Sequence, residues 1–499
     1  MRQTGSVLLV LCLLSETLFC QTYTQGLEFE DDTYSSQNRL ALITGGKSLP
    51  SSVDLSEFCP FPRNQGSILS CVGWATGYGA LTIERAIQNN WTDRTHITNE
   101  SSSALFLFNQ IKVSDCSRGA RISDALEFLQ EGGDCLARYF DKNLDDCHQA
   151  PTPELIRHAA QFRISDYAAL FSEQMDAEGK IFVLRRVLAE KKPVVVGLRI
   201  LENFKKLNGS EFWFPGIGDT TYAGGHAMVV VGYDDNRRAF KLFNSWGANW
   251  GNKGFILVKY ADFVNFVKYA YVLYLGKSPI LKDSQSSPGE PGRMELGKPE
   301  SRTREISGQF RFMRFTGQAS SDGNFVFEQP AVSGHENIYH LQDRWPTGER
   351  FQLHIEPGQV SGYVYVLSID ASGKSEIHWP KDEKFNEKFS GLHESAIIPF
   401  SGGIVRIPGP DRVLKLTRPG EEHLVVLFSE RKIVPEFLYY LKDQLNGPGI
   451  KVQETLQEAL ADYHLLQSEI FYSPESMQFT AKTDGPRAIV SILLKIEVI

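Results

Sequence analysis

A stretch rich in proline, glycine and serine divides this 499-residue chain into two halves with different patterns. We expect residues 277–308 to form a flexible linker, because they show no apolar period and their centre reads Ser-Ser-Pro-Gly-Glu-Pro-Gly over 286–292. A chain of this length exceeds one ordinary hydrophobic core, so we expect two or three domains. The apolar and charged fractions of 42% and 22% are those of a globular protein, and a net charge of −8 argues against a general nucleic-acid or membrane-surface role.

The first half, residues 50–276, combines helical and strand patterns. Apolar residues at helical spacing predict helices over 71–86, 122–129 and 180–191, the last of which ends before Pro193. Apolar runs rich in β-branched and aromatic residues predict strands over 194–198, 227–233, 239–243 and 255–259. Because the helices come mostly early and the strands mostly late, we expect an α+β domain with a helical lobe and a sheet lobe.

The second half, residues 309–499, alternates apolar and polar residues with period two. Strands are predicted over 351–355, 363–367, 413–416 and 424–428, with Gly and Pro turns between them. We expect an all-β, sandwich-like domain with a helix over 452–466 inserted before the last strands. The aromatic residues leave two interpretations open, because they could bind an unknown ligand or, as with Tyr363 and Tyr365, pack in the sheet core. The histidines of this half show no metal-ligand spacing, so we expect no metal site.

The N-terminus has the pattern of a secretory signal. Arg2 precedes a short apolar run, Val7–Leu14, which is too short to span a bilayer. We expect residues 1–20 to be removed, which leaves a short N-terminal extension, residues 21–49, on a secreted or periplasmic protein. A lipid anchor on Cys20 is the alternative, although Phe19 is larger than the small residue that a lipobox places before its cysteine. No later run is long and apolar enough to predict a membrane helix.

Five cysteines remain after the signal, all in the first half: Cys59, Cys71, Cys116, Cys135 and Cys147. An odd number in an oxidising compartment leaves one thiol unpaired, and the surroundings of Cys71 give it a reason to be free. The other four could form two bridges in three different pairings, or some could stay reduced and buried. The sequence does not choose between these alternatives.

Four residues have the local settings that a thiol nucleophile and its partners need. Cys71 immediately precedes a predicted helix, whose dipole favours a thiolate. His226 would serve as the base and would pair with the thiolate when protonated, while the side-chain oxygen of Asn244 would orient the imidazole. Gln65 and the Cys71 N–H would donate to a developing oxyanion. Taken singly, each residue has a plainer explanation: a core cysteine, a strand-edge histidine, a turn asparagine and a surface amide.

These residues occur together in longer motifs, all in one order. The motifs are Val53-Asp54, Gln65-Gly66, Ser70-Cys71, Gly225-His226-Ala227 leading to Gly232-Tyr233, and Asn244-Ser245-Trp246-Gly247 followed by Trp250-Gly251. Over about residues 50–275 the chain resembles the papain family of cysteine peptidases. The resemblance implies hydrolysis of a peptide or protein substrate through a covalent thioester and without a cofactor. It implies catalytic roles for Cys71, His226, Asn244 and Gln65, and substrate-binding roles for Gly119, Trp246 and Gly225.

The cysteine motif departs from the family signature, in which a first cysteine stands where this chain has Ile68 and an aromatic residue stands where it has Val72. These features resemble the bacterial branch of the family. Residues 309–499 resemble a β-rich domain of unknown function that bacteria attach to peptidases.

The extension, residues 21–49, is too short for a long helical pro-region. We therefore expect little autoinhibition, so that the protein should cleave a peptide with this extension still attached. Two alternatives to a peptidase stay open. One is a catalytically silent papain-fold protein that binds a partner and is anchored by its β domain, and the other is an amide- or acyl-transferase.

Overall fold

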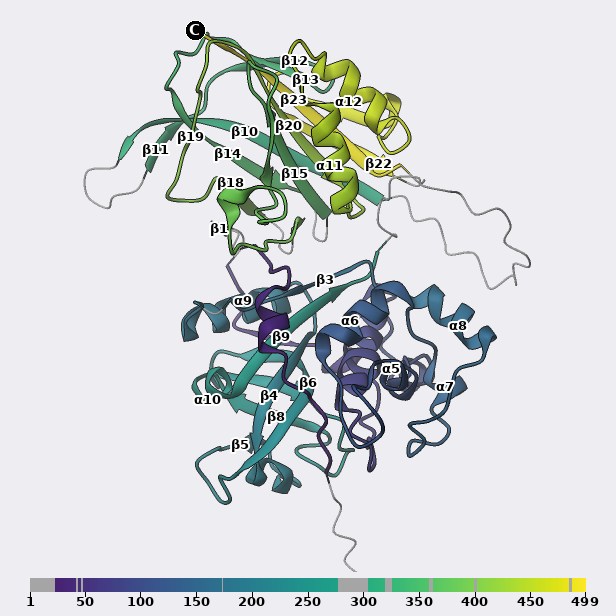
Figure 1. The fold of residues 1–499 in the computed structure, drawn as a ribbon. Coiled ribbons are helices and arrows are strands. Elements are labelled where there is room, and N and C mark those ends of the chain that lie inside the picture. The colour runs from purple at the N-terminus through teal and green to yellow at the C-terminus, as the bar shows by residue number, and fades with distance from the viewer. Residues whose placement is uncertain are drawn as a thin grey trace, which may run out of the picture.

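The computed structural model forms two domains, shown in Figure 1 with the N-terminal domain below and the C-terminal domain above. The structure describes residues 23–41, 44–45, 48–172, 174–276, 304–318, 325–358, 362–398, 402–483 and 487–499. The predicted signal and most of the predicted linker lie outside these residues.

The longest helical stretch of the helical lobe begins at Cys71, as predicted. An unbroken helical stretch runs through α2 (Cys71–Gly73), the π-helical η2 (Trp74–Leu81) and α3 (Thr82–Gln88). Glycine is needed in this buried stretch because a Cβ at Gly73 would lie 2.2 Å from the carbonyl oxygen of Ala104. The other short helices of the lobe are η1 (Ser56–Phe58), α4 (Arg94–Asn99), α5 (Ala104–Ile111), α6 (Ile122–Glu131), α7 (Ala137–Phe140), α8 (Pro153–Ala159) and η3 (Ala160–Phe162).

The sheet lobe is built on strands that pair in the order β3-β9-β4-β6-β7-β8-β5, with β2 beside β6. Their bounds are β2 (Ser52–Asp54), β3 (Asp166–Ala169), β4 (Val194–Leu201), β5 (Phe212–Trp213), β6 (Tyr222–Asp234), β7 (Ala239–Phe243), β8 (Phe255–Lys259) and β9 (Val267–Tyr274). Three further elements belong to this lobe: α9 (Ala177–Ala189), η4 (Glu202–Lys206) and α10 (Tyr260–Phe266). The four strands predicted for this half are confirmed, with β6 extending further toward the N-terminus than expected.

The C-terminal domain contains two sheets whose inner faces meet, as shown by the rings of Phe428 and Phe479, which lie 4.9 Å apart on strands of different sheets. The first sheet contains β1 (Thr44–Gly45), β10 (Arg304–Gln318), β11 (Phe325–Glu328), β14 (Arg350–Pro357), β18 (Gly403–Ile407), β19 (Leu414–Lys415), β21 (Ile470–Tyr472) and β22 (Gln478–Thr483). The second contains β12 (Val332–His335), β13 (Ile338–Leu341), β15 (Gly362–Ile369), β16 (Ser375–Trp379), β17 (Ile397–Ile398), β20 (Gly420–Ser429) and β23 (Ile489–Val498). Tyr363 and Tyr365 are both buried, which favours the core interpretation over ligand binding.

Three details differ from the sequence expectation. Strand β10 begins at Arg304, inside the segment predicted to be linker, because pairing with β22 satisfies its backbone from that residue onward. The helix predicted over 452–466 is shorter, α12 (Val452–Leu460), and a second helix, α11 (Pro435–Gln444), precedes it. The short 3-10 turns η5 (Glu387–Phe389) and η6 (Gln467–Glu469) complete the domain.

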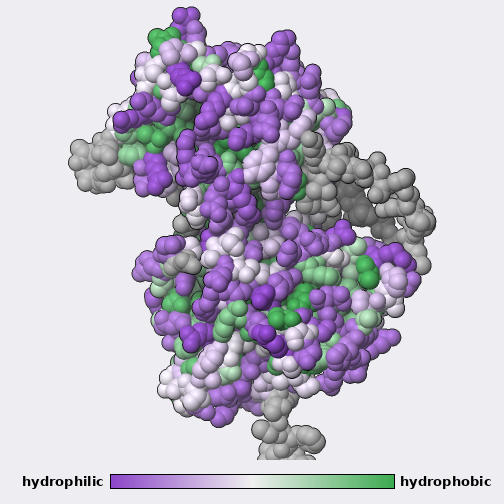
Figure 2. Space-filling model, in the orientation of Figure 1, coloured by the Kyte–Doolittle hydropathy of each residue, from purple (hydrophilic) through white to green (hydrophobic). Residues whose placement is uncertain are grey.

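In the space-filling view of Figure 2, hydrophilic residues cover most of the visible surface and hydrophobic ones gather in separate small patches. The face shown therefore has no single large hydrophobic patch. None of the helices formed by the described residues combines the length and the apolar character that a bilayer crossing requires.

Candidate active site

The thiol of Cys71 lies at the junction of the two lobes. Cys71 opens the long helix of the helical lobe, and its Sγ accepts a hydrogen bond at 3.4 Å from the backbone N–H of Ala227 on β6 of the sheet lobe. Ala227 directly follows His226, so the backbone beside the predicted base contacts the predicted nucleophile. The position at a helix start also agrees with the prediction.

One ring nitrogen of His226 is held and the other is left without a partner. Its Nε2 lies 2.7 Å from Oδ1 of Asn244, and that oxygen also accepts the N–H of Ser245 at 2.8 Å. The ring of Trp246 stacks on the imidazole at 4.4 Å, which shields the bond to Asn244 from water. Its Nδ1 is buried and has no hydrogen-bond partner among the described residues, which leaves it available for a proton.

The amide of Gln65 also lies where the sequence suggested. Its Oε1 accepts from the hydroxyl of Ser245 at 2.6 Å, which turns the Nε2 donors toward the space beside the helix start. Nε2 donates at 3.1 Å to the carbonyl oxygen of Gln25 and at 3.0 Å to that of Ile68. A donor that already holds a peptide carbonyl in this position could hold a substrate carbonyl in the same way.

The carbonyl on Gln65 belongs to a segment that covers the site, residues 23–30, which we call the strap. The Tyr23 ring stacks on Trp246 at 5.0 Å, and Trp246 Nε1 donates to the Thr24 carbonyl at 2.8 Å. Further along, the Leu27 N–H donates to the carbonyl of Gly225 at 3.2 Å. These contacts involve Trp246 and Gly225, two of the three residues for which a substrate-binding role was predicted.

The third residue, Gly119, lies where residues 119–120 pair with the strap. The N–H of Ala120 donates to the Gly26 carbonyl at 2.9 Å, and the N–H of Glu28 donates to the Ala120 carbonyl at 3.0 Å. A Cβ on Gly119 would lie 1.7 Å from the Gly26 carbonyl oxygen. Gly26 has φ +125, and a Cβ on it would lie 1.9 Å from the carbonyl oxygen of Leu69. Only glycine fits at these two positions while the strap is in place.

Two acidic side chains anchor the far end of the strap, and sequence reasoning assigned no role to either. Glu28 forms an ion pair with Arg118 at 2.5 Å and accepts the Gly119 N–H at 3.2 Å. Glu30 is buried, and its carboxylate accepts the N–H and the hydroxyl of Ser123 in the first turn of α6. The spacing of Glu28 and Glu30 was the only sequence signal for these anchors. Their partners are 91 and 93 residues away along the chain, so the sequence alone did not identify them.

This arrangement corrects two expectations. The protein was expected to show little autoinhibition, yet its own residues 23–30 occupy the predicted site. A thiolate–imidazolium pair was also expected, but Cys71 and His226 are both fully buried. Burial raises the pKa of Cys71 to about 12 and lowers the pKa of His226 to about 4, so both groups are neutral under the strap. A helix dipole does not offset the removal of water from both groups.

The remaining cysteines follow none of the three two-bridge pairings. Cys116 and Cys147 form a disulfide, whereas Cys59 and Cys135 are buried free thiols. His148 Nε2 lies 3.0 Å from Cys116 Sγ, and these three residues form the one group of potential metal ligands found within the described parts of the chain. Because the disulfide occupies both sulfurs, the group does not offer two thiolates to a metal in this form.

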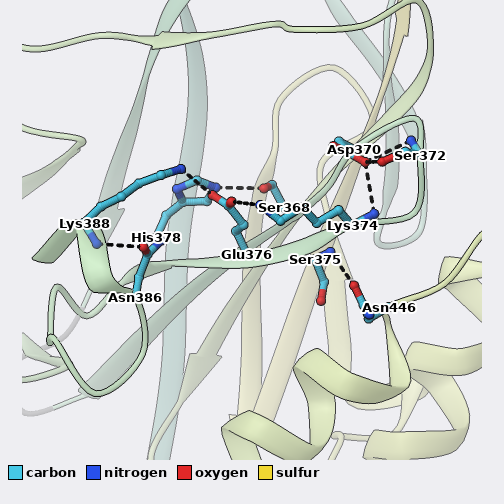
Figure 3. Close-up of polar contacts among 10 residues, drawn as sticks. All are labelled: Ser368, Asp370, Ser372, Lys374, Ser375, Glu376, His378, Asn386, Lys388 and Asn446. Atoms are coloured by element: carbon cyan, nitrogen blue, oxygen red, sulfur yellow. Dashed lines mark hydrogen bonds and ion pairs between the residues drawn. The ribbon is translucent and has the colours of Figure 1, made fainter.

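A second cluster of polar side chains lies on the hairpin of β15 and β16 in the C-terminal domain (Figure 3). His378 Nε2 lies 2.8 Å from the hydroxyl of Ser368, and burial lowers the pKa of His378 to about 4. Glu376 forms ion pairs with Lys374 at 2.7 Å and with Lys388 at 3.0 Å. The Glu376 carboxylate is therefore already paired with two lysines. We interpret this cluster as ion pairs and hydrogen bonds that stabilise the surface of the sheet.

Residues 49–270 match the model of the papain family cysteine proteases. An uncharacterised peptidase C1-like protein of Acanthamoeba polyphaga mimivirus is 22% identical over 257 residues, which are 49% of this chain and 80% of that protein. Cysteine proteinase 3 of Entamoeba histolytica is 21% identical over 248 residues, or 48% of this chain and 71% of the relative.

Among solved structures, xylellain, a cysteine protease from Xylella fastidiosa, is similar to 51% of this chain over 96% of its own, with 24% identity and a TM-score of 0.42. The family match covers both lobes and all four residues of the candidate site. Residues 49–270 of this chain therefore form a papain family cysteine protease domain.

Proposed function

We propose that this protein is a secreted cysteine peptidase in which Cys71, His226 and Asn244 form the catalytic triad. The observation that carries the proposal is the state of His226, whose Nε2 is held by Asn244 while its Nδ1 has no partner among the described residues, and whose neighbour in sequence, Ala227, contacts the Cys71 thiol through its N–H. This is the arrangement that a base needs, because one nitrogen fixes the ring and the other exchanges a proton with the nucleophile.

In the proposed reaction, Nδ1 of His226 takes the thiol proton and Sγ of Cys71 attacks the carbonyl carbon of the substrate peptide bond. The oxyanion accepts hydrogen bonds from Gln65 Nε2 and the Cys71 N–H. The imidazolium then gives its proton to the leaving amine, and a thioester remains on Cys71. Water, deprotonated by His226, attacks the thioester, and collapse of the second oxyanion releases the carboxylic acid and restores the thiol.

The strap makes the form described here latent. It takes up the amide of Gln65, the face of Trp246 and the backbone groups of Gly225 and Ala120, so that a substrate competes with it for the same donors and acceptors. When the strap leaves, water enters the cleft and the cost of charging Cys71 and His226 falls, which favours the ion pair. Activity thus depends on displacing residues 23–30.

The alternative of a catalytically silent binding protein lacks a comparable observation. His158 and His393 also have a buried Nδ1 without a hydrogen-bond partner among the described residues, so this feature favours a peptidase only at His226, where a free thiol contacts the next residue of the strand. The proposed peptidase uses Nδ1 of His226 in each proton transfer.

A peptidyl epoxide that alkylates thiolates tests the proposal. Leu27→Asp places a carboxylate against the apolar surroundings of Leu27, which is 6% exposed, and should weaken the strap. We expect the Leu27→Asp protein to hydrolyse a fluorogenic peptide and to be labelled at one residue, Cys71, by mass mapping. The unchanged protein should be labelled more slowly.

Two cysteine variants serve as controls in the Leu27→Asp background. Cys71→Ala should remove both hydrolysis and labelling, whereas Cys59→Ala should leave both in place, since Cys59 is a free buried thiol outside the site. Hydrolysis that survives Cys71→Ala would contradict the proposed nucleophile. Absence of both hydrolysis and labelling in the Leu27→Asp protein would favour the binding-protein alternative.

A further inference from the structure

The segment that follows the strap adds a strand to the edge of the sheet lobe. β3 is the outermost strand of that sheet, and its last residue, Ala169, pairs with residues 38–40. The Ala169 N–H donates to the Asn38 carbonyl at 2.8 Å, and the Leu40 N–H donates to the Ala169 carbonyl at 3.0 Å. The edge of the peptidase sheet is thereby covered by the chain's own N-terminal extension.

The other side of the same segment pairs with the C-terminal domain. The Arg39 N–H donates to the His393 carbonyl at 2.6 Å, and the Ser395 N–H donates to the Arg39 carbonyl at 2.8 Å. A few residues later, β1 pairs antiparallel with β18, Thr44 opposite Ile404. Figure 1 shows β1 beside β18 on the side of the C-terminal domain that faces the protease domain. Arg39 is thus the middle position of a three-segment pairing that joins the two domains.

Side chains reinforce the junction from both domains. Lys432 of the C-terminal domain forms an ion pair at 2.6 Å with Asp166 of β3, whose side chain is only 2% exposed. The guanidinium of Arg39 donates to the Phe171 carbonyl at 3.2 Å and to the Tyr34 carbonyl in α1 at 3.3 Å. The residue that pairs with both domains therefore also holds the helix that leads back to the strap.

The distance along the chain between the junction and the strap is short. Helix α1 (Asp31–Ser35) separates the anchor Glu30 from Asn38, so about eight residues connect the end of the strap to the junction. Displacing the C-terminal domain leaves the contacts of this segment with the protease domain, in which Tyr34 packs on Tyr269 and Tyr271 of β9 and residues 38–40 pair with Ala169. When these contacts open as well, the next fixed point in the chain is β2, whose Ser52 pairs with Asp234, about 22 residues from Glu30.

We propose that the C-terminal domain acts as a clamp that keeps the strap in the cleft, an inference that rests on the peptidase and strap roles proposed above. By pairing with Arg39 and with Thr44–Gly45, the domain holds the tether of the strap close to the cleft. A displacement of the domain removes these partners and favours opening of the remaining contacts of residues 31–40, which lengthens the tether and lowers the effective concentration of the strap at its site. The accessory domain is in this way a regulator of latency.

The expected size of the effect follows from the tether lengths. Effective concentration falls roughly as the −3/2 power of tether length, so the change from about 8 to about 22 residues corresponds to roughly fivefold. Because this effect is modest, opening of the strap must be measured directly by hydrogen exchange, in addition to measuring the reactivity of Cys71.

Lys432→Glu tests the clamp, because it sets a carboxylate against the buried Asp166. We expect amide hydrogen exchange of residues 24–30 to become roughly fivefold faster in the full-length protein. Alkylation of Cys71 by the peptidyl epoxide should accelerate by a similar factor. Lys432→Gln, which removes the ion pair without adding repulsion, should change both rates in the same direction but less.

The matched control is Lys451→Glu, the same substitution at a lysine of the same domain whose side chain is 74% exposed and pairs only with Glu454 in its own helix region. It should leave both rates unchanged. Unchanged exchange in β20 and β23 shows that the variant domain is folded. In a Leu27→Asp background, where the strap is already weakened, Lys432→Glu should add nothing to the labelling rate.

Strap exchange in Lys432→Glu equal to that in Lys451→Glu would overturn the clamp, whatever the activity. Failure of the proposed peptidase function would give a different result. Cys71 would then be unreactive in the Leu27→Asp protein, while the exchange rate of the strap would still increase in Lys432→Glu.

Discussion

The two domains both bury histidines, and the comparison shows which feature separates a catalytic histidine from a structural one. His226 in the protease domain accompanies Asn244, and His354 in the C-terminal domain accompanies Gln352, with distances from imidazole Nε2 to amide oxygen of 2.7 and 2.9 Å. Burial lowers the pKa of each histidine to about 4. Burial, an amide partner and a lowered pKa therefore do not distinguish them.

The difference lies in what else surrounds each imidazole. The second nitrogen of His226 is buried without a partner, and a free thiol lies beside the next residue of its strand. No cysteine lies in the described part of the C-terminal domain. A perturbed histidine indicates function here only when a nucleophile accompanies it.

The largest expected effect comes from removing each histidine. His226→Ala, made in the Leu27→Asp background, should lower kcat by about 10³- to 10⁴-fold, because no other group can accept the thiol proton. His354→Ala should leave kcat unchanged and lower only the melting temperature. Peptide hydrolysis and thermal unfolding measure the two effects. Equal losses of kcat in both variants would break the comparison.

Removing the amide partner of each histidine should also lower kcat only in the protease domain, but by less than removing the histidine itself. Asn244→Ala frees the imidazole to rotate and should reduce kcat by about 100-fold, since orientation is only part of the contribution of the base. Gln352→Ala, the corresponding change in the other domain, should reduce stability without changing kcat. Both kcat values are read from the same fluorogenic assay, and a loss below twofold for Asn244→Ala would argue against its role as orienter.

A methyl group on the strap should open the cleft. Gly26→Ala introduces a Cβ that would lie 1.9 Å from the Leu69 carbonyl oxygen, at a φ of +125 that side chains rarely adopt. We expect labelling of Cys71 to accelerate by roughly 10- to 100-fold. Gly216→Ala is the matched control, because a Cβ there meets nothing within 4 Å. An unchanged labelling rate in Gly26→Ala would show that the strap does not limit access.

The smallest effect expected is on pH dependence. Burial raises the pKa of Glu30 from 4.5 to about 7, and the nearby Asp124 contributes to the rise, while hydrogen bonds from Ser123 oppose it. The bound strap therefore holds a proton that the free strap releases between these values, so binding is strongest in acid and weakens as pH rises through 7. The neutral Cys71–His226 pair and the ion pair carry the same number of protons, so that equilibrium adds no pH dependence.

The ratio of labelling rates between Gly26→Ala and the unchanged protein measures latency at each pH and cancels the intrinsic pH dependence of the thiol. We expect this ratio to fall steadily between pH 5 and pH 8, because Glu30 holds its proton only in the bound strap over this range. Glu30→Gln should make the ratio nearly independent of pH, because glutamine does not titrate. A ratio that rises with pH would contradict the assignment to Glu30.

Local patterns were sufficient to find the site and most of its elements. Cys71 precedes a helix, His226 starts an apolar strand run and Asn244 follows the next one, and all three signals lie within a few residues of the side chain concerned. The helix α11 was not predicted, because Pro435 and the apolar residues that follow it fit a strand–turn pattern as well as a short helix.

The amino-acid sequence by itself pointed to the candidate catalytic residues, the two lobes and the β-rich second domain, because each depends on side-chain type and local periodicity. Only the tertiary structure decided that the site is covered, that its ionisable groups are neutral and that the extension pairs with both domains. Those properties arise from backbone contacts between segments about 90 to 350 residues apart, such as Gly26 with Ala120 and Arg39 with Ser395. Backbone hydrogen bonds carry no side-chain signature, and the desolvation that shifts the pKa values of Cys71 and His226 exists only in the folded protein.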